Sequence, residues 1–248
     1  MKELTKGRYR VRQAQSRADM AAVMALRGLT FRGDAGADDS DAFDTRAMHV
    51  IIEDMRAEGE AARLACAFRL LRLSGGGDIA QGYTAQFYDT APLASYPGPM
   101  LEMGRFCIDP AARGDPHVLR TAWVGMTDLI DSQGISFLFG CSSFHGTDPA
   151  EHFDALALLR DSYTAPSALR PAPKAPQTHP FTALPDRAPD KRTALLTMPP
   201  LLRSFLLLGG WVSDHAVVDD DLGTLHVFTG LEIQSVPPAR ARALRASV

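Results

Sequence analysis

The sequence predicts a mixed α/β fold, a central sheet with helices on both faces. Strand-like apolar runs alternate with helix-like segments along most of the chain, and two strand-like segments near the C-terminal end predict a late hairpin. No internal repeat is present. The 248 residues, 46% hydrophobic and 22% charged, suit an ordinary globular protein with one large α/β domain or two small ones. We expect a single domain over residues 1–248, with a Pro-rich irregular segment at 165–190 and a basic C-terminal tail at 237–248.

The first half of the chain predicts two helices and three strands. An amphipathic helix is expected over Ser16–Leu29, with Ser16 as its N-terminal cap. A second helix is expected over Pro116–Ser132, and Gly134 ends it. Strands are expected at 49–53, 62–73 and 101–109, and the second of these runs into a turn of consecutive glycines.

The second half predicts a strand at 135–144, then a helix that Thr147 or Asp148 caps, with Pro149 in its first turn. Residues 165–189 contain seven of the 17 prolines and show no periodicity, which indicates an irregular connection over the surface. A short apolar helix is expected over Pro200–Leu208, followed by strands at 215–218 and 224–229.

Charge argues against a dedicated nucleic-acid binder, because the net charge is −3. The distribution is uneven, however. Residues 1–32 carry eight Lys and Arg against two acids, and the tail carries three arginines without an acid. Basic ends suit an anionic partner such as a lipid surface or an acidic carrier protein, and solubilising ends are the alternative.

Cysteine and histidine spacing predicts neither disulfides nor a metal site. The three cysteines lie far apart without a CxxC pair, and the histidines form no HxxxH or HExxH motif. We therefore expect a cytoplasmic protein with reduced thiols. The basic start lacks the apolar core of a signal peptide. The apolar stretch Leu201–Trp211 is too short to span a bilayer, so it is either a core helix or a segment that lies on a membrane.

Charged residues inside apolar segments are the candidates for chemistry. The stretch Leu101–Pro110 reads LEMGRFCIDP, and it places Glu102 and Arg105 within an apolar strand. Burying such groups costs free energy unless they are paired or needed for catalysis. The remaining candidates are Arg27, Asp41, Asp44 and Arg69. Two interpretations are open: surface charges and structural ion pairs, or a buried polar network in a cleft where Glu102 acts as a base.

Side chains alternate along a regular strand, so Glu102 and Arg105 should point to opposite faces. A bulge at Gly104 would bring both to one site, whereas a regular strand would assign them to different networks. Covalent catalysis by Cys141 with His145 is the weaker hypothesis, because no third residue that would orient the histidine is evident.

The order of these residues carries a resemblance. The pattern Arg27–Phe31, Asp41-Ala-Phe-Asp44, Arg69, Glu102-x-x-Arg105-Phe resembles the core of the acyl-homoserine lactone synthases. Three longer segments, LEMGRFCIDP, LFGCSSFHGTDP and PPLLRSFLLLGGWVSDHAVVD, resemble more specifically the N-acyltransferases that make lyso-ornithine lipid. The resemblance extends from about residue 9 to residue 227.

The resemblance implies a GNAT-like acyl-CoA N-acyltransferase fold. It also implies transfer of a 3-hydroxyacyl chain from acyl carrier protein to the α-amino group of L-ornithine, without a metal or other cofactor. Glu102 would be the base and Arg105 its partner or a substrate clamp. An oxyanion would be stabilised by backbone N–H groups near Cys107. The substrate-binding residues implied are Arg27, Phe31, Asp41, Asp44, Arg69, Cys107, Ser142 and Ser143.

The donor prediction rests on one further segment. DPAARGDPHVLRTAW has Arg113-Gly114 but lacks the second glycine of the turn that binds the pyrophosphate of CoA in relatives of this fold. A carrier-protein donor is therefore expected, with Arg113 and Arg120 toward the phosphopantetheine phosphate.

The chain departs from the resembled family at Leu222–His226, which replaces an Asn-Thr-Thr-Asp-like run. Glutamine therefore stays open as the acceptor beside ornithine. Two rival functions also stay open, an acyl-homoserine lactone synthase-like enzyme and a non-catalytic module that binds lipid or carrier protein. Peripheral contact with the inner face of the cytoplasmic membrane is a further expectation.

Overall fold

The computed structural model spans residues 1–248 and describes residues 1–55 and 62–248. The chain divides into two compact units. The first unit comprises residues 1–72, 103–135 and 238–248. The second comprises residues 73–102 and 136–237. Strand β6 (Met100–Ile108) contributes residues 100–102 to the second unit and residues 103–108 to the first.

The first unit is built on antiparallel ladders that join β1 to β2, β2 to β3 and β3 to β4. Its helices are α1, α2 and α6, and short helical turns follow α1 and β6. The bounds are β1 Leu4–Lys6, β2 Tyr9–Gln13, α1 Arg17–Arg27, η1 Gly28–Arg32, β3 Met48–Asp54, β4 Arg63–Leu73, η5 Pro110–Ala112, α2 Pro116–Gln133 and α6 Pro238–Arg245. The sequence does not predict β1 and β2, because basic residues interrupt their apolar positions.

Side-chain alternation gives this ladder two apolar faces. Val11 lies beneath α2, where a β-carbon at Gly125 would come within 2.8 Å of a Val11 methyl group. On the opposite face, Ile51 and Ala67 pack with Val23 of α1 in one buried cluster. Because neighbouring residues point to opposite faces, this arrangement turns His49 of β3 and Arg69 of β4 toward α1 as well.

Helix α1 begins as predicted at the Ser16 cap. The Ser16 hydroxyl accepts the Asp19 N–H at 3.0 Å, and the Asp19 carboxylate accepts the Ser16 N–H at 3.0 Å, a reciprocal capping box. The α-helix ends at Arg27, and the chain continues as the π-helical turn η1. Such turns are frequent at functional sites, and this one carries Phe31.

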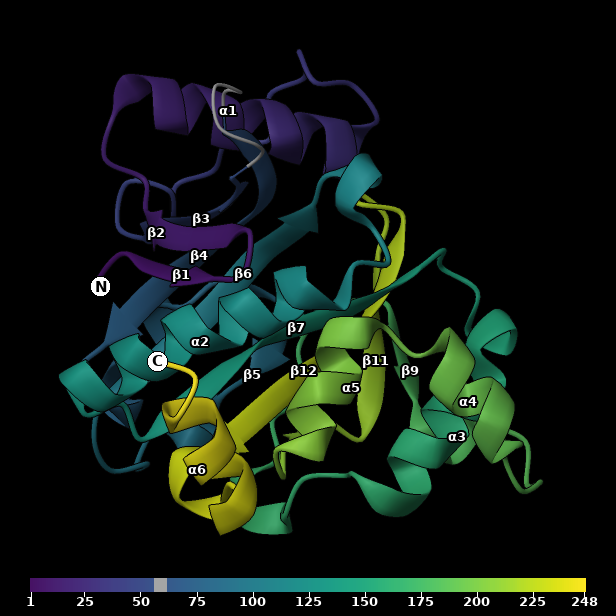
Figure 1. The fold of residues 1–248 in the computed structure, drawn as a ribbon. Coiled ribbons are helices and arrows are strands. Elements are labelled where there is room, and N and C mark those ends of the chain that lie inside the picture. The colour runs from purple at the N-terminus through teal and green to yellow at the C-terminus, as the bar shows by residue number, and fades with distance from the viewer. Residues whose placement is uncertain (56–61) are drawn as a thin grey trace. The chain divides into compact units, whose positions relative to one another are not determined.

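The second unit contains an antiparallel sheet in which β7, β12, β11 and β9 are successive neighbours. Strand β10 also pairs with β12, and β5 pairs with β8. The helices α3 and α4 lie side by side (Figure 1). The bounds are η2 Gly76–Gln81, η3 Thr84–Gln86, β5 Tyr88–Asp89, η4 Ala91–Leu93, β7 Phe137–His145, η6 Pro149–His152, α3 Phe153–Ser162, η7 Ser167–Leu169, β8 Ala172–Pro173, β9 Thr178–Pro180, η8 Phe181–Ala183, α4 Lys191–Thr197, α5 Pro200–Leu207, β10 Trp211–Val212, β11 His215–Asp219, β12 Thr224–Glu232 and η9 Ile233–Ser235.

Two expectations about segments need correction. The Pro-rich region 165–190 is not only a surface connection, because β9 joins the sheet beside β11 and Phe181 is buried in the core of the second unit. The basic tail 237–248 contains a helix, α6, in which the Arg245 guanidinium pairs with Asp131 of α2 at 2.7 Å. Because prolines are frequent in residues 165–190, the sequence did not indicate the three-residue strand β9 there.

The apolar stretch Leu201–Trp211 is mainly a core element. Leu202, Phe205, Leu206, Leu208 and Trp211 are all buried. The prediction of a core helix is therefore confirmed for Leu202, Phe205 and Leu206 of α5, whereas Trp211 belongs to strand β10. Within the described part of the chain, no helix has the length and apolar character needed to cross a membrane.

Candidate active site

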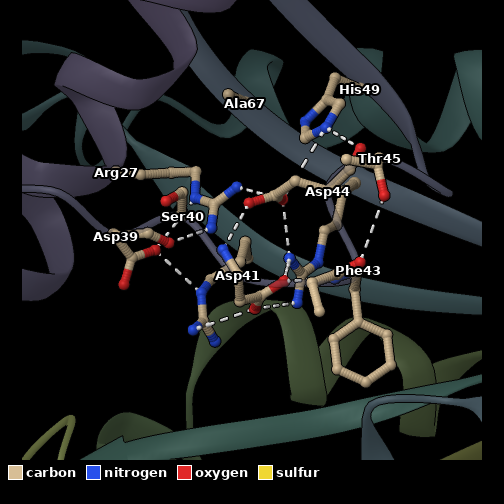
Figure 2. Close-up of polar contacts among 12 residues, drawn as sticks. Arg27, Asp39, Ser40, Asp41, Phe43, Asp44, Thr45, His49 and Ala67 are labelled. Atoms are coloured by element: carbon tan, nitrogen blue, oxygen red, sulfur yellow. Dashed lines mark hydrogen bonds and ion pairs between the residues drawn. The ribbon is translucent and has the colours of Figure 1, made fainter.

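Arg27, the last residue of α1, is 1% exposed and is held by two aspartates. Its Nε donates to Asp39 Oδ2 at 3.0 Å, and its Nη1 donates to Asp44 Oδ1 at 2.6 Å (Figure 2). Its Nη2 donates to the Asp39 carbonyl oxygen. A guanidinium stays in a protein interior only when its charge is paired, so this buried arginine depends on the acidic loop that follows η1.

Gly28 allows that loop to approach the helix. A β-carbon at this position would lie 2.5 Å from the Ala37 carbonyl oxygen and 2.6 Å from that of Asp34. The Asp34 N–H in turn donates to the Gly28 carbonyl oxygen at 3.2 Å. A side chain at residue 28 would therefore push the loop, and its aspartates, away from Arg27.

Arg69 of β4 joins the same group from the sheet. Strand alternation turns it toward α1, opposite His49 of β3. Its guanidinium binds the Asp41 carboxylate with both terminal nitrogens, Nη1 to Oδ1 at 2.5 Å and Nη2 to Oδ2 at 2.7 Å, and Nη1 also donates to Asp44 Oδ1 at 2.7 Å. Arg69 is 3% exposed, so the interpretation of this residue as an outward-facing surface charge is wrong.

Arg105 of β6 completes the group. Its Nε donates to Asp39 Oδ2 at 2.9 Å, and its Nη2 lies 3.5 Å from Asp41 Oδ2. The guanidinium carbon is 5.5 Å from the centre of the Phe31 ring, within cation–π range. Asp39 also accepts from Arg32 Nε at 3.1 Å, so one carboxylate that is 2% exposed serves three arginines.

We call the seven ionised residues of this group the charged cluster: Arg27, Arg32, Asp39, Asp41, Asp44, Arg69 and Arg105. Four arginines against three aspartates give the cluster a formal excess of one positive charge. Phe31 and Phe43 lie against two of the guanidinium groups, Arg105 and Arg69, each at 5.5 Å. The cluster thus joins helix α1, the acidic loop and strands β4 and β6.

Burial and pairing act in opposite directions on the ionisable groups here. Burial alone would raise the pKa of Asp44, but hydrogen bonds from Arg27, from the Asp41 N–H and from Arg69 bring it to about 2. Burial lowers the pKa of His49, and the hydrogen bond with the Asp44 carbonyl opposes this only partly. The neutral imidazole places Nε2 3.1 Å from that carbonyl oxygen, to which it donates.

Glu102, the predicted base, is 3% exposed and belongs to the second unit. Its two carboxylate oxygens each accept a backbone N–H at 2.7 Å, Oε2 from Tyr83 and Oε1 from Thr84. Charge-assisted bonds of this kind stabilise an ionised carboxylate. Gly82 packs directly against the same carboxylate.

The strand distortion predicted at Gly104 occurs one residue later. Arg105 has φ 52°, the left-handed region, where a residue with a side chain is strained by about 1–3 kcal/mol. Beyond it the alternation is regular, because Cys107 packs on the α1 face and Phe106 stacks on Phe68. Glu102 contacts Tyr83 and Thr84, whereas Arg105 contacts Asp39 and Asp41, so these contacts belong to different networks.

Comparisons with known proteins identify the family to which the chain belongs. The acetyltransferase (GNAT) domain family matches residues 24–123, a range that contains the charged cluster and Glu102. An L-ornithine N(alpha)-acyltransferase of Rhodobacter capsulatus is 33% identical over 239 residues, covering 92% of this chain and 91% of the relative. The chain belongs to the family of the L-ornithine N(alpha)-acyltransferases. It is an acyltransferase.

A second relative agrees with this assignment, and one solved structure supports the fold. The L-ornithine N(alpha)-acyltransferase of Brucella abortus is 32% identical and covers 93% of this chain and 86% of the relative. Among solved structures, FeeM, an N-acyl amino acid synthase from uncultured soil microbes, superposes with a TM-score of 0.51 over 92% of each chain at 11% identity, which supports the fold alone. The predicted GNAT-like mixed α/β fold is confirmed.

Not all residues predicted for the acyltransferase site share one environment. Arg27, Phe31, Asp41, Asp44, Arg69 and Arg105 meet in or against the charged cluster. Cys107 is a core residue, and burial raises the pKa of its thiol to about 12. In the second unit, Ser142 is buried and accepts from the Thr229 hydroxyl at 2.9 Å, whereas the neighbouring Ser143 is exposed. Arg113 and Arg120 are exposed, on the turn after η5 and on α2. All of these roles stay predictions.

The sequence did not single out three residues of this acyltransferase: Asp39 and Arg32, which belong to the charged cluster, and His49, which contacts Asp44. Asp39 stands in a run of aspartates where nothing distinguishes it from Asp38, which is exposed. Asp39 differs from Asp38 because it pairs with the buried Arg27, which only the folded structure shows. Among the described residues, no group of three or more His, Cys, Asp or Glu side chains is placed to hold a metal ion.

Proposed function

We propose that this acyltransferase moves a 3-hydroxyacyl group from acyl carrier protein to the α-amino group of L-ornithine and so forms lyso-ornithine lipid. The observation that carries the proposal is the nearly full-length match to relatives named L-ornithine N(alpha)-acyltransferase, of which two are 33% and 32% identical. The exposed Arg113 and Arg120 support a phosphopantetheine-bearing donor, because a phosphate group attracts exposed guanidinium groups.

The chemistry requires a base, because an α-ammonium group has no lone pair. We assign this role to Glu102, whose carboxylate accepts one proton from the ammonium and later releases it to solvent. The amine nitrogen then attacks the thioester carbon, a C–N bond forms and the C–S bond breaks. The second amine proton goes to the departing thiolate, so an amide and a free thiol remain. General base catalysis of this kind contributes roughly 10²–10⁴-fold.

The predicted role of Arg69 and Arg105 is to bind the carboxylate of the amino acid. The excess positive charge of the charged cluster supports this role. The fork of Arg69 already binds Asp41 with both terminal nitrogens, so a substrate carboxylate would have to compete with that aspartate. Arg105 is paired with Asp39 and Asp41, so a substrate carboxylate at Arg105 would meet competition of the same kind.

Location at a membrane forms part of the proposal, because the product is amphiphilic. The support comes from α4, where Leu195 and Leu196 are 44% and 72% exposed. Lys191 and Arg192 of the same helix are also exposed. An exposed apolar pair beside basic residues suits the interface of an anionic bilayer.

The decisive experiment offers the purified protein 3-hydroxyacyl carrier protein together with ornithine, glutamine or each of the remaining amino acids. Products are read by mass spectrometry. We expect an N-acyl amide with ornithine. A product with glutamine alone would make glutamine the acceptor, in line with the departure at Leu222–His226, and the absence of any N-acyl product would contradict the proposal.

A further inference from the structure

A groove of about 580 Å³ lies in the second unit, on the segment that connects β4 to β6. This volume falls within the range of ligand sites, about 300–1,000 Å³. Its floor includes the buried residues Ile79, Ala85 and Tyr88. Its walls come from η2, η4 and β8. Strand β8 pairs with β5 in antiparallel orientation.

Half of the residues that line this groove are glycine or alanine. Gly77, Ala80, Ala91 and Ala94 lie along it and present methyl groups and backbone, beside the larger side chains of the floor. A β-carbon added at Gly77 would meet no atom within 4 Å. An open groove of this composition fits an unbranched hydrocarbon, which needs apolar contact and no hydrogen-bond partner.

The carboxylate and the ammonium group on the lining, Asp89 and Lys174, both bind to the protein backbone. Lys174 Nζ donates to the Ala85 carbonyl oxygen at 2.6 Å, and Asp89 Oδ1 accepts the Ala91 N–H at 3.0 Å. These bonds tie the walls of the groove together. They also make the groove poorly suited to a charged ligand that would need to recruit both groups.

The same segment holds the proposed base. Ala85 lies on the groove floor, and the two residues before it, Tyr83 and Thr84, donate their N–H groups to Glu102. Gly82 packs on the Glu102 carboxylate, and Ile79 in the preceding turn lines the groove. One short stretch of chain therefore shapes both the surroundings of Glu102 and the apolar groove.

We infer that this groove holds the hydrocarbon chain of the acyl donor. The inference rests on the proposed function, since a long-chain acyltransferase must shield the alkyl tail of its substrate from water while the thioester reacts. The length of the groove then limits the chain length that the enzyme accepts. The acceptor amino acid is the competing occupant, and the experiment separates the two.

Two variants that fill the groove provide the test, Gly77→Leu on η2 and Ala91→Leu on η4. Both positions lie outside the buried core, so each change adds apolar volume to the groove without displacing core side chains. We expect kcat/KM for a 3-hydroxypalmitoyl donor to fall roughly 10–200-fold, the effect of one or more displaced methylene groups in an apolar pocket. The rate with a 3-hydroxybutyryl donor should stay within about twofold of the unmodified enzyme. Ala239→Leu on α6 is the matched control, an added exposed leucine outside the groove, and should change neither rate.

Equal losses with both donors, or a change confined to the KM of ornithine, would overturn the inference; the second result would assign the groove to the acceptor. A photo-crosslinking experiment keeps the test independent of turnover. A palmitic acid analogue with a terminal diazirine should label residues 76–94 or 173–174, and Gly77→Leu should reduce this labelling. Labelling elsewhere contradicts the groove. Labelling in the groove without any N-acyl product would retain the alkyl site and reject the proposed function.

Discussion

Gly82 lies against the carboxylate of Glu102, so closely that a β-carbon at residue 82 would come within 2.9 Å of Glu102 Oε2 and 3.2 Å of its Cδ. Both carboxylate oxygens are held by backbone N–H groups from the next two residues of the same turn. The carboxylate therefore has little room to yield. A turn that lacks a side chain is what lets the N–H donors reach Glu102.

We predict that Gly82→Ala lowers the rate of acyl transfer without unfolding the protein. The added methyl group must displace the carboxylate, and a shift of about 1 Å in a reacting group costs roughly 10²-fold. The measurement is kcat/KM beside a thermal unfolding curve. Gly36→Ala is the control, because a β-carbon there would make only an ordinary contact, 3.5 Å from Asp34 Oδ1. Equal activity of the two variants would show that the position of Glu102 is not critical.

A second prediction concerns the base itself. Glu102→Gln keeps the shape of the side chain but provides an amide that cannot accept the ammonium proton. We expect kcat to fall roughly 10²–10⁴-fold, while the KM for the acyl donor stays nearly unchanged. A variant that retains more than a tenth of the normal kcat would remove Glu102 from the mechanism.

The charged cluster yields a prediction about stability. Asp39 accepts hydrogen bonds from three arginines, so Asp39→Asn leaves buried positive charge without its partner. We expect the free energy of unfolding to fall by about 3–5 kcal/mol, the usual cost of breaking a buried ion pair. The comparison is Asp131→Asn, which removes the exposed pair with Arg245 and should cost about 0–1 kcal/mol. Urea titrations of both variants measure the difference, and similar losses would argue against a structural role for the cluster.

The sequence predicted many elements to within a few residues because their apolar segments are long and end in polar or glycine-rich turns. The strand expected at 62–73 and the helix at 116–132, for example, are found at Arg63–Leu73 and Pro116–Gln133. It did not predict β9, since a strand of three residues that ends in Pro180 carries no periodic signal. A strand of this kind forms only because β11 offers a partner.

The candidate site shows the same division between local and distant information. Apolar surroundings identified Arg27, Arg69, Glu102 and Arg105, because a charge in such a segment is costly. The partners were harder to predict. Asp39 is one of several aspartates in a short run, and the donors to Glu102 are backbone N–H groups that any residue could supply. Their selection depends on how the chain folds back, which no local pattern of residues records.

The histidine His226 yields a prediction about pH. It is 2% exposed and its Nδ1 lies 2.9 Å from the Tyr88 hydroxyl. Burial, followed by the nearby His215, lowers the pKa of His226 from 6.5 to about 4. In the unfolded chain His226 therefore binds a proton below about pH 6.5, whereas in the folded protein it does so only below about pH 4. The free energy of unfolding therefore falls as the pH drops through this window. The shift corresponds to about 3 kcal/mol. Urea titrations between pH 7 and pH 4 should show the loss, and His226→Asn should flatten the slope; an unchanged slope would assign the loss to other groups.

Exposed leucines on α4 lead to the last prediction. Leu196 is 72% exposed and Leu195 is 44% exposed, beside Lys191 and Arg192. If this surface meets a bilayer, the leucines enter the interface and the basic residues contact anionic head groups. The protein should then sediment with vesicles that contain phosphatidylglycerol, less so with pure phosphatidylcholine, and less at high salt.

Replacing both leucines with serine should abolish sedimentation and leave acyl transfer from carrier protein in solution intact. Val248→Ser, which removes another exposed apolar side chain, serves as the control. Sedimentation that survives the double serine variant would mean that the protein meets membranes through a different surface.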